Sequence, residues 1–154
     1  MLFLISLSIS ICTYGQESAN STHANLNWQQ NFKTAQKLAK LEEKPLLLFF
    51  TGSDWCGPCK MLVTDFFESD KFSELATKEF ILYEADFPRN KDLVTKSQRT
   101  DNTLLKQKYK VTSFPTLLIV NFKGKKLGKK KGYNLMRETS YHFDFLESIL
   151  KNIK

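Results

Sequence analysis

The sequence is poor in the side chains that bind metals and cross-link chains: its 154 residues include three cysteines and two histidines. A structural zinc site needs four such ligands at suitable spacing, and His23 and His142 lie far from any cysteine pair. Long hydrophobic stretches are scarce too, since the apolar run at residues 1–15 is too short to span a bilayer comfortably. We therefore expect no metal site, and no bilayer-spanning helix from this run.

The composition instead indicates a folded domain with a sizeable core. Hydrophobic residues make up 42% of the chain, with thirteen phenylalanines, and charged residues make up 25%. This balance argues against intrinsic disorder, and the length fits one domain. The formal charge of +7 would attract acidic partners at low salt, but it does not identify a reaction.

Residues 1–15 contain no charged side chain and have the character of a signal peptide. Cleavage after Thr13-Tyr14-Gly15 would leave small residues in the required positions, and we expect a periplasmic or secreted protein. Lipid attachment at Cys12 is an alternative, but Ile9-Ser10-Ile11 lacks the leucine and small residue of a bacterial lipoprotein signal. A buried N-terminal segment is a second alternative.

The rest of the chain divides into a short linker and one domain. Residues 16–25 are small and polar without periodicity, which predicts a flexible linker, and the domain takes up residues 26–154. Within it, hydrophobic periodicity predicts helices at 26–43, 60–67, 71–79, 104–109 and 139–153, and strands at 46–50, 80–86 and 116–122. A lysine-rich arm ending near Gly132 completes a hairpin. The order predicts an α/β fold with a central mixed β-sheet flanked by helices.

Cys56 and Cys59, two residues apart in the run CGPC, are the chemically informative pair. Such a pair can bind a metal, form a structural bridge or take part in redox reactions. A metal site lacks further ligands, and a bridge closing so short a loop adds little stability. Redox function is the interpretation that we favour.

The position of the pair supports this interpretation. It lies where a buried strand gives way to a helix, so Cys56 should begin the helix, whose free N–H groups favour a thiolate. Cys59, one turn later, would be the resolving thiol. Pro58 fits a first helical turn, and Gly57 leaves room for a substrate backbone. Trp55 would either shield the sulfurs or fill the core.

The runs TGSDWCGPCK, SFPTLLIV and GKKLGKKKGYN resemble the thioredoxin family, especially its exported bacterial members, and the resemblance covers Leu26 to the C-terminus. It implies a thioredoxin fold in which Pro115 is a cis-proline facing the active disulfide. The backbone around Phe114 would then pair with an extended substrate segment. Phe114 as a simple core residue remains the alternative.

Two departures from the family stand out. Phe50 occupies the place of the buried aspartate that helps move protons to the resolving thiol, so Cys59 must use another group or water. Asp54, expected to be exposed, and Glu84 are the weak candidates. We expect slower exchange than in a typical cytosolic thioredoxin. The second departure is the long polar excursion at 88–103, with one helical turn near Leu93, which we expect to influence partner choice.

The expected function is thiol–disulfide oxidoreductase, reducing disulfides of exported proteins, with no cofactor beyond the Cys56–Cys59 disulfide. Partners would be protein disulfides and a reducing electron donor, membrane-bound if the protein is periplasmic, and the protein would be a monomer. A disulfide oxidase or isomerase, and a non-catalytic binding module or chaperone, are the alternatives. A solvated sheet edge explains the lysine-rich arm better than a nucleic acid partner does.

Overall fold

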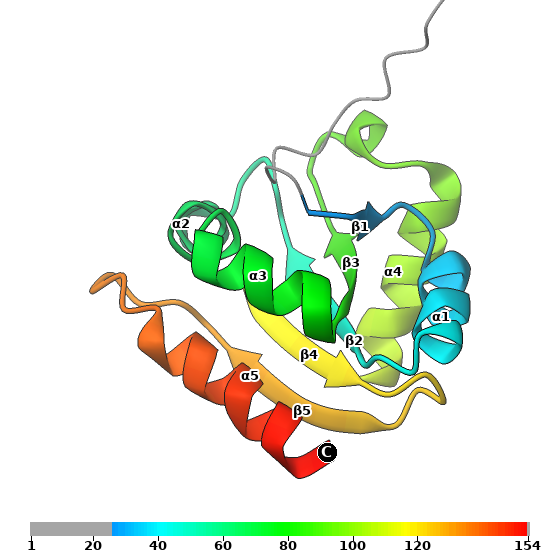
Figure 1. Cartoon of the computed structure of the whole chain (residues 1–154). Coiled ribbons are helices and arrows are strands. Elements are labelled where there is room, and N and C mark those ends of the chain that lie inside the picture. Colours follow the sequence, from blue (N-terminus) through cyan, green and yellow to red (C-terminus); the bar gives the residue numbers. More distant parts are fainter. Residues whose placement is uncertain (1–25, 154) are drawn as a thin grey trace, which may run out of the picture.

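Strand β2 (Leu46–Thr51) occupies the centre of a five-stranded sheet in the computed structural model, which describes residues 26–153 (Figure 1). All six of its residues are buried. It pairs in parallel with β3 (Ile81–Asp86) and antiparallel with β4 (Thr116–Val120). A strand covered on both faces has an uninterrupted apolar sequence, so the prediction made from the run at 46–50 is confirmed.

The two edges of the sheet differ sharply in length and charge. The strand order is β1-β3-β2-β4-β5, with β1 (Trp28–Gln29) parallel to β3 and β5 (Lys126–Lys131) antiparallel to β4. The sheet is therefore mixed, and the lysine-rich arm is an edge strand, as predicted. Charge on an edge strand discourages pairing with other chains.

Helices cover both faces of the sheet (Figure 1). One face carries α1 (Phe32–Leu41) and α4 (Lys96–Lys108), and the other carries α2 (Gly57–Leu62), α3 (Asp70–Glu79) and α5 (Ser140–Ile153). The core on the second side is rich in aromatic residues, and it includes both cysteines of the CGPC run. The reactive pair is thus built into one of the two cores.

The predicted helix at 26–43 is wrong at its beginning. Trp28 lies in β1, buried, with its ring 5.3 Å from that of Phe67. Helix α1 begins after Asn31, whose side chain accepts a hydrogen bond from the amide of Thr34 at 3.1 Å. This N-cap sets the start of the helix, and the apolar spacing of Trp28 misled the prediction.

The polar excursion at 88–103 also needs correction, because half of it is helix. A 3₁₀ turn, η2 (Lys91–Leu93), is followed by α4, which begins eight residues before the predicted helix at 104–109. Thr95 and Gln98 form a reciprocal capping box at its start. At its other end, Lys129 of β5 donates to the carbonyls of Tyr109 and Lys110. Caps at both ends stabilise a helix with few apolar residues.

The predicted helix at 60–67 exists but changes type. Its first part is α2, and its second part is a π-helical turn, η1 (Val63–Phe67), closed by a hydrogen bond from the amide of Glu68 to the carbonyl of Val63. Such turns occur often near functional sites.

The predicted signal peptide and linker, residues 1–15 and 16–25, with Cys12 and His23, lie outside the described residues. Within residues 26–153, no helix is both long enough and apolar enough to cross a membrane.

Candidate active site

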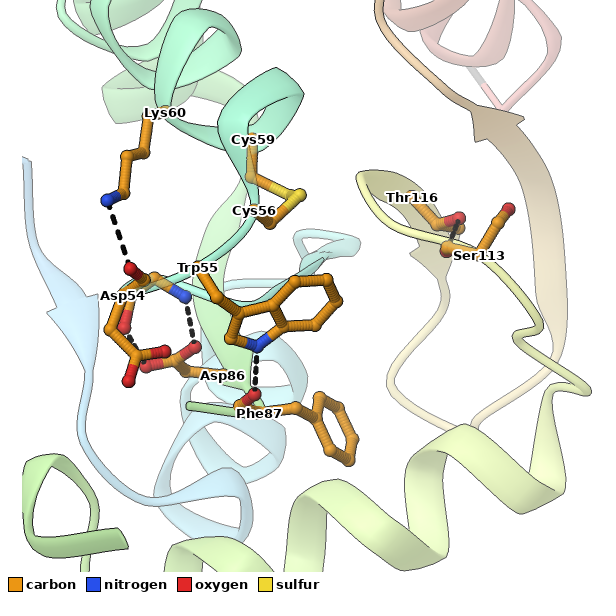
Figure 2. Close-up of a disulfide and its surroundings, with 10 residues drawn as sticks. Asp54, Trp55, Cys56, Cys59, Lys60, Asp86, Phe87, Ser113 and Thr116 are labelled. Atoms are coloured by element: carbon orange, nitrogen blue, oxygen red, sulfur yellow. Dashed lines mark hydrogen bonds between the residues drawn. A yellow bond between two sulfur atoms is a disulfide. The ribbon is translucent and has the colours of Figure 1, made fainter. Parts of the chain in front are cut away.

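Cys56 and Cys59 form a disulfide at the start of α2, with an S–S distance of 2.04 Å and Cα atoms 5.2 Å apart (Figure 2). Cys56 is the N-cap residue of the helix, and its carbonyl accepts the amide of Lys60 at 3.1 Å. Pro58 lies in the first helical turn, where the missing N–H costs nothing. The predicted placement of the pair at a strand-to-helix junction is confirmed.

Both cysteines of the pair are buried. Cys56 is 5% exposed and Cys59 1% exposed. A Cβ atom built on Gly57 would meet nothing within 4 Å, so the backbone between the cysteines is open to an approaching chain. Disulfide exchange needs a path by which a target disulfide can reach the pair, and the open backbone at Gly57 provides one.

Trp55 lies on the surface beside the disulfide and is not core filler, because 40% of it is exposed. Its indole Nε1 donates to the carbonyl of Phe87 at 2.9 Å (Figure 2), and its ring lies 6.0 Å from that of Phe114. Gly52 makes room for it, since a Cβ atom there would fall 2.3 Å from the indole. Sequence reasoning did not identify this role of Gly52.

The Phe114–Pro115 peptide bond is cis, as the family resemblance implied. The carbonyl of Pro115 accepts the amide of Gly132 at 2.8 Å, which joins the loop before β4 to the end of β5. Phe114 is partly buried and stacks on Phe87 with ring centroids 5.2 Å apart. The Trp55 contact places this loop beside the cysteines.

A buried carboxylate does occur near the motif, at a position that the sequence analysis did not single out. Asp86, the last residue of β3, accepts hydrogen bonds from the amide and the hydroxyl of Ser53 at 2.8 and 2.6 Å. Burial raises its pKa, and the two bonds from Ser53 oppose that shift. Strand pairing is what indicates this position: the parallel strands β2 and β3 end together, with Thr51 opposite Asp86.

The three positions discussed for proton transfer have distinct surroundings. Phe50 is fully buried in the core on the α1 and α4 side. Asp54 is exposed, as expected, and its carboxylate accepts the amides of Asn90 and Arg89, which lower its pKa. Asp54 is therefore an ionised anchor for the 86–90 segment. Glu84 is half-buried in β3.

Helix α4 supports the same corner through Asn102, which is fully buried. Its amide nitrogen donates to the carbonyl of Asp86 at 2.8 Å, and its oxygen accepts the hydroxyl of Tyr83 at 2.6 Å. The predicted polar excursion thus supplies a buried support for the end of β3.

A second aspartate, Asp65 of η1, fastens the loop between β5 and α5. It accepts a hydrogen bond from the hydroxyl of Tyr133 at 2.7 Å and a bidentate pair from Arg137, whose Nε lies 2.8 Å away. The Arg137 guanidinium is the main cause that lowers the pKa of Asp65, whereas burial raises that of Tyr133 to about 12. These contacts span 68 and 72 residues of sequence, and no local pattern indicated them.

Metal ligands are not grouped in the part of the chain that the structure describes, where no three His, Cys, Asp or Glu side chains come together. His142 is buried between the rings of Phe66 and Tyr133, with centroids 5.5 Å from each.

Comparison with known proteins places this geometry among disulfide-exchanging proteins. A family model described as thioredoxin-like domain matches residues 32–144. The disulfide bond reductase DsbH of Chlamydia pneumoniae is 37% identical over 114 residues, which are 74% of this chain and 68% of that protein. A solved structure named DsbH oxidoreductase superposes with a TM-score of 0.72 at 32% identity, covering 89% of this chain and 95% of the other. A disulphide isomerase from Xylella fastidiosa Temecula1 gives a TM-score of 0.58 at 25% identity, covering 91% and 100%.

Proposed function

The chain belongs to the family of thioredoxin-like domains and is a thiol–disulfide oxidoreductase, and from this premise we propose that it reduces disulfide bonds of exported proteins through Cys56 and Cys59. The observation that carries the proposal is the position of the pair: Cys56 is the N-cap of α2, and Cys59 follows one turn later and is joined to it by a disulfide. The name of the similar Chlamydia reductase supports the direction of the reaction.

The reaction begins with the reduced protein. The Cys56 thiolate, favoured by the free N–H groups at the helix start, attacks one sulfur of the target disulfide. A mixed disulfide forms, and the other target sulfur leaves as a thiolate that takes up a proton. Cys59 then loses its proton and attacks Cys56, which releases the second target thiol and forms the Cys56–Cys59 disulfide. Two electrons pass to the target.

The surrounding residues position the target. Trp55 and the cis-Pro115 loop flank the disulfide, and Gly57 leaves the backbone open. An extended target segment would add a short strand of hydrogen bonds along Phe114. Since Phe50 replaces the usual acid, another group or water must take the proton of Cys59, and we expect exchange to be slower than in a typical cytosolic thioredoxin. Stopped-flow reduction of a model disulfide measures this rate.

The proposed location is outside the cytoplasm, because residues 1–15 have the composition of a signal peptide. A periplasmic reductant must be recharged after each turnover, and a membrane-bound thiol donor is the proposed source of electrons. The protein acts as a monomer in this scheme and needs no cofactor beyond its own disulfide.

Oxidation or isomerisation of disulfides is the second candidate, favoured by the likeness to the Xylella isomerase. Equilibrium with glutathione buffers decides between the two. The Gly57-Pro58 dipeptide is that of reducing thioredoxins, so we expect a potential near about −270 mV. A value above about −180 mV would favour the oxidase or isomerase.

The roles of the two sulfurs are tested by a matched pair of variants. Cys59→Ser should accumulate mixed disulfides with target proteins, because the resolving thiol is missing, and Cys56→Ser should trap none. Mass spectrometry of the trapped complexes identifies the targets. Full biological activity of Cys56→Ser would instead indicate a binding module or chaperone.

A further inference from the structure

Two large apolar side chains project from the loop that joins β5 to α5. Leu135 and Met136 are consecutive, and each is 84% exposed. Single exposed apolar residues are common on protein surfaces and need no explanation. Two neighbours exposed to this degree on one loop form a small apolar tip. Such a tip can contact a binding partner reproducibly only if the loop has a fixed conformation.

The loop is held at both sides of this tip. Tyr133 and Arg137 both donate to Asp65 of η1, and the Arg137 amide closes a turn on the carbonyl of Asn134 at 3.1 Å. Arg137 has a φ of 55°, a left-handed conformation that is unfavourable for a residue with a Cβ atom. The hydrogen bonds of Tyr133 and Arg137 to Asp65 hold the loop in this conformation, with its apolar tip in solvent.

The fixed loop is bonded to two elements that adjoin the disulfide. Asp65 belongs to η1, which continues directly from α2 and its cysteines. At the other end, the Gly132 amide bonds to the carbonyl of cis-Pro115 at 2.8 Å. Figure 1 shows this loop reaching past α5 toward α2. The loop is thus joined at its start to the cis-Pro115 loop, which flanks the disulfide, and held further along by the element that follows α2.

Positive charge lies next to the tip. A cavity of about 330 Å³ opens between the end of β5 and the start of α5, and its lining includes Lys130, Lys131, Asn134 and Tyr141. Glu138 also lines it, but its carboxylate accepts the amide of Ser140 at the start of α5 and is partly compensated there. The cavity is thus suited to a carboxylate side chain of a partner.

We propose that the 134–138 loop and this cavity form a docking surface for disulfide-bearing protein substrates that carry apolar and acidic side chains near the target cysteine. The partner's apolar residue packs on Leu135 and Met136, and its carboxylate binds beside Lys130 and Lys131. This inference rests on the proposed function, since it names the substrate class of the same disulfide.

The test uses two synthetic peptides of equal length, each closed by one disulfide. One carries leucine and two glutamates next to a cysteine, and the other carries serine and two glutamines there. The pre-reduced protein is mixed with each peptide in a single turnover, and each second-order rate constant is divided by that for 2-hydroxyethyl disulfide. We expect about a tenfold preference for the acidic, apolar peptide.

Variants then locate the preference. Leu135→Ser with Met136→Ser should remove most of it, whereas Leu41→Ser, which alters an equally prominent exposed leucine at the end of α1, should leave it intact. Circular dichroism checks that all variants are folded. Lys130→Glu with Lys131→Glu should reverse the charge preference, and added salt should weaken it in the unaltered protein.

Equal rates for the two peptides, or an undiminished preference in the Leu135 and Met136 variant, would overturn the docking surface while leaving the oxidoreductase intact. Failure to reduce even 2-hydroxyethyl disulfide would instead contradict the proposed function. The two failures are therefore distinguishable.

Discussion

Two loops flank the disulfide, and an aspartate fastens each, but the two aspartates have different roles. On one side, Asp86 is buried and binds the amide and hydroxyl of Ser53, directly before the motif. On the other side, Asp65 binds Tyr133 and Arg137 from a loop whose tip is in solvent. The first contact fixes the segment that carries the cysteines, and the second fixes a surface that a partner can touch.

Stability and recognition are therefore separated across the site, with the Asp86 side serving stability and the Asp65 side serving recognition. Buried hydrogen bonds to a carboxyl group stabilise the fold because their loss leaves polar groups without partners. An ion pair whose arginine is 53% exposed contributes little to stability, since water screens it. Changes on the Asp86 side should therefore act mainly on the folding free energy, and changes at Asp65 should act mainly on substrate choice.

Acid should have the largest effect, through His142 beside Tyr133. Burial, with help from Lys130, lowers the pKa of His142 to about 4, whereas the unfolded chain has the ordinary value near 6.5. The unfolded state then binds more protons between these values, so the free energy of unfolding should fall by about 3 kcal/mol from pH 7 to pH 4. Urea unfolding at both pH values measures this.

His142→Phe is the matched variant, because it keeps an aromatic ring in the buried site and removes the group that titrates. The pKa of Asp86 is raised, so this residue stabilises the fold as the pH falls, which is opposite to the effect of His142. Its contribution is the same in the unaltered protein and in His142→Phe. The difference between them isolates His142, and an equal pH dependence in both would refute its role.

Asp86→Ala should lower the free energy of unfolding by about 2 kcal/mol, because the Ser53 amide and hydroxyl lose their acceptor. Ser53→Ala removes the hydroxyl bond alone and should cost about 1 kcal/mol. Denaturant unfolding gives both values. The comparison between the loops breaks down if Asp86→Ala leaves stability unchanged and alters peptide preference instead.

Asp65→Asn should have the smallest effect on stability, below about 1 kcal/mol, because about half of the Arg137 side chain is exposed to water. Asp65→Asn should reduce the preference for the acidic, apolar peptide, since the loop loses its charged anchor. Glu147→Gln in α5, which removes a surface ion pair with Lys71 of α3, is the control and should change neither stability nor peptide preference. A large loss of stability with intact preference would show that both aspartates serve the fold.

The sequence alone was informative where the signal is local. The apolar run at 46–50 predicted a strand buried on both faces, and the CGPC run after it predicted a cysteine pair at a helix start. The lysine-rich arm predicted an edge strand. Each of these depends on neighbours within a few residues, so periodicity and turn chemistry sufficed. The cis bond at Pro115 came from the family resemblance.

Long-range contacts decided the rest. Trp28 has helical spacing from Phe32, yet pairing with β3 makes it a strand residue. Asp86 and Ser53 are 33 residues apart, and Asp65 and Arg137 are 72 apart, so the anchors of both loops form only when the sheet and helices assemble. Sequence determined the chemistry of this protein, because the two cysteines of the CGPC run lie within one helical turn after a buried strand. Tertiary structure decided what surrounds them, because hydrogen bonds and burial depend on distance in space.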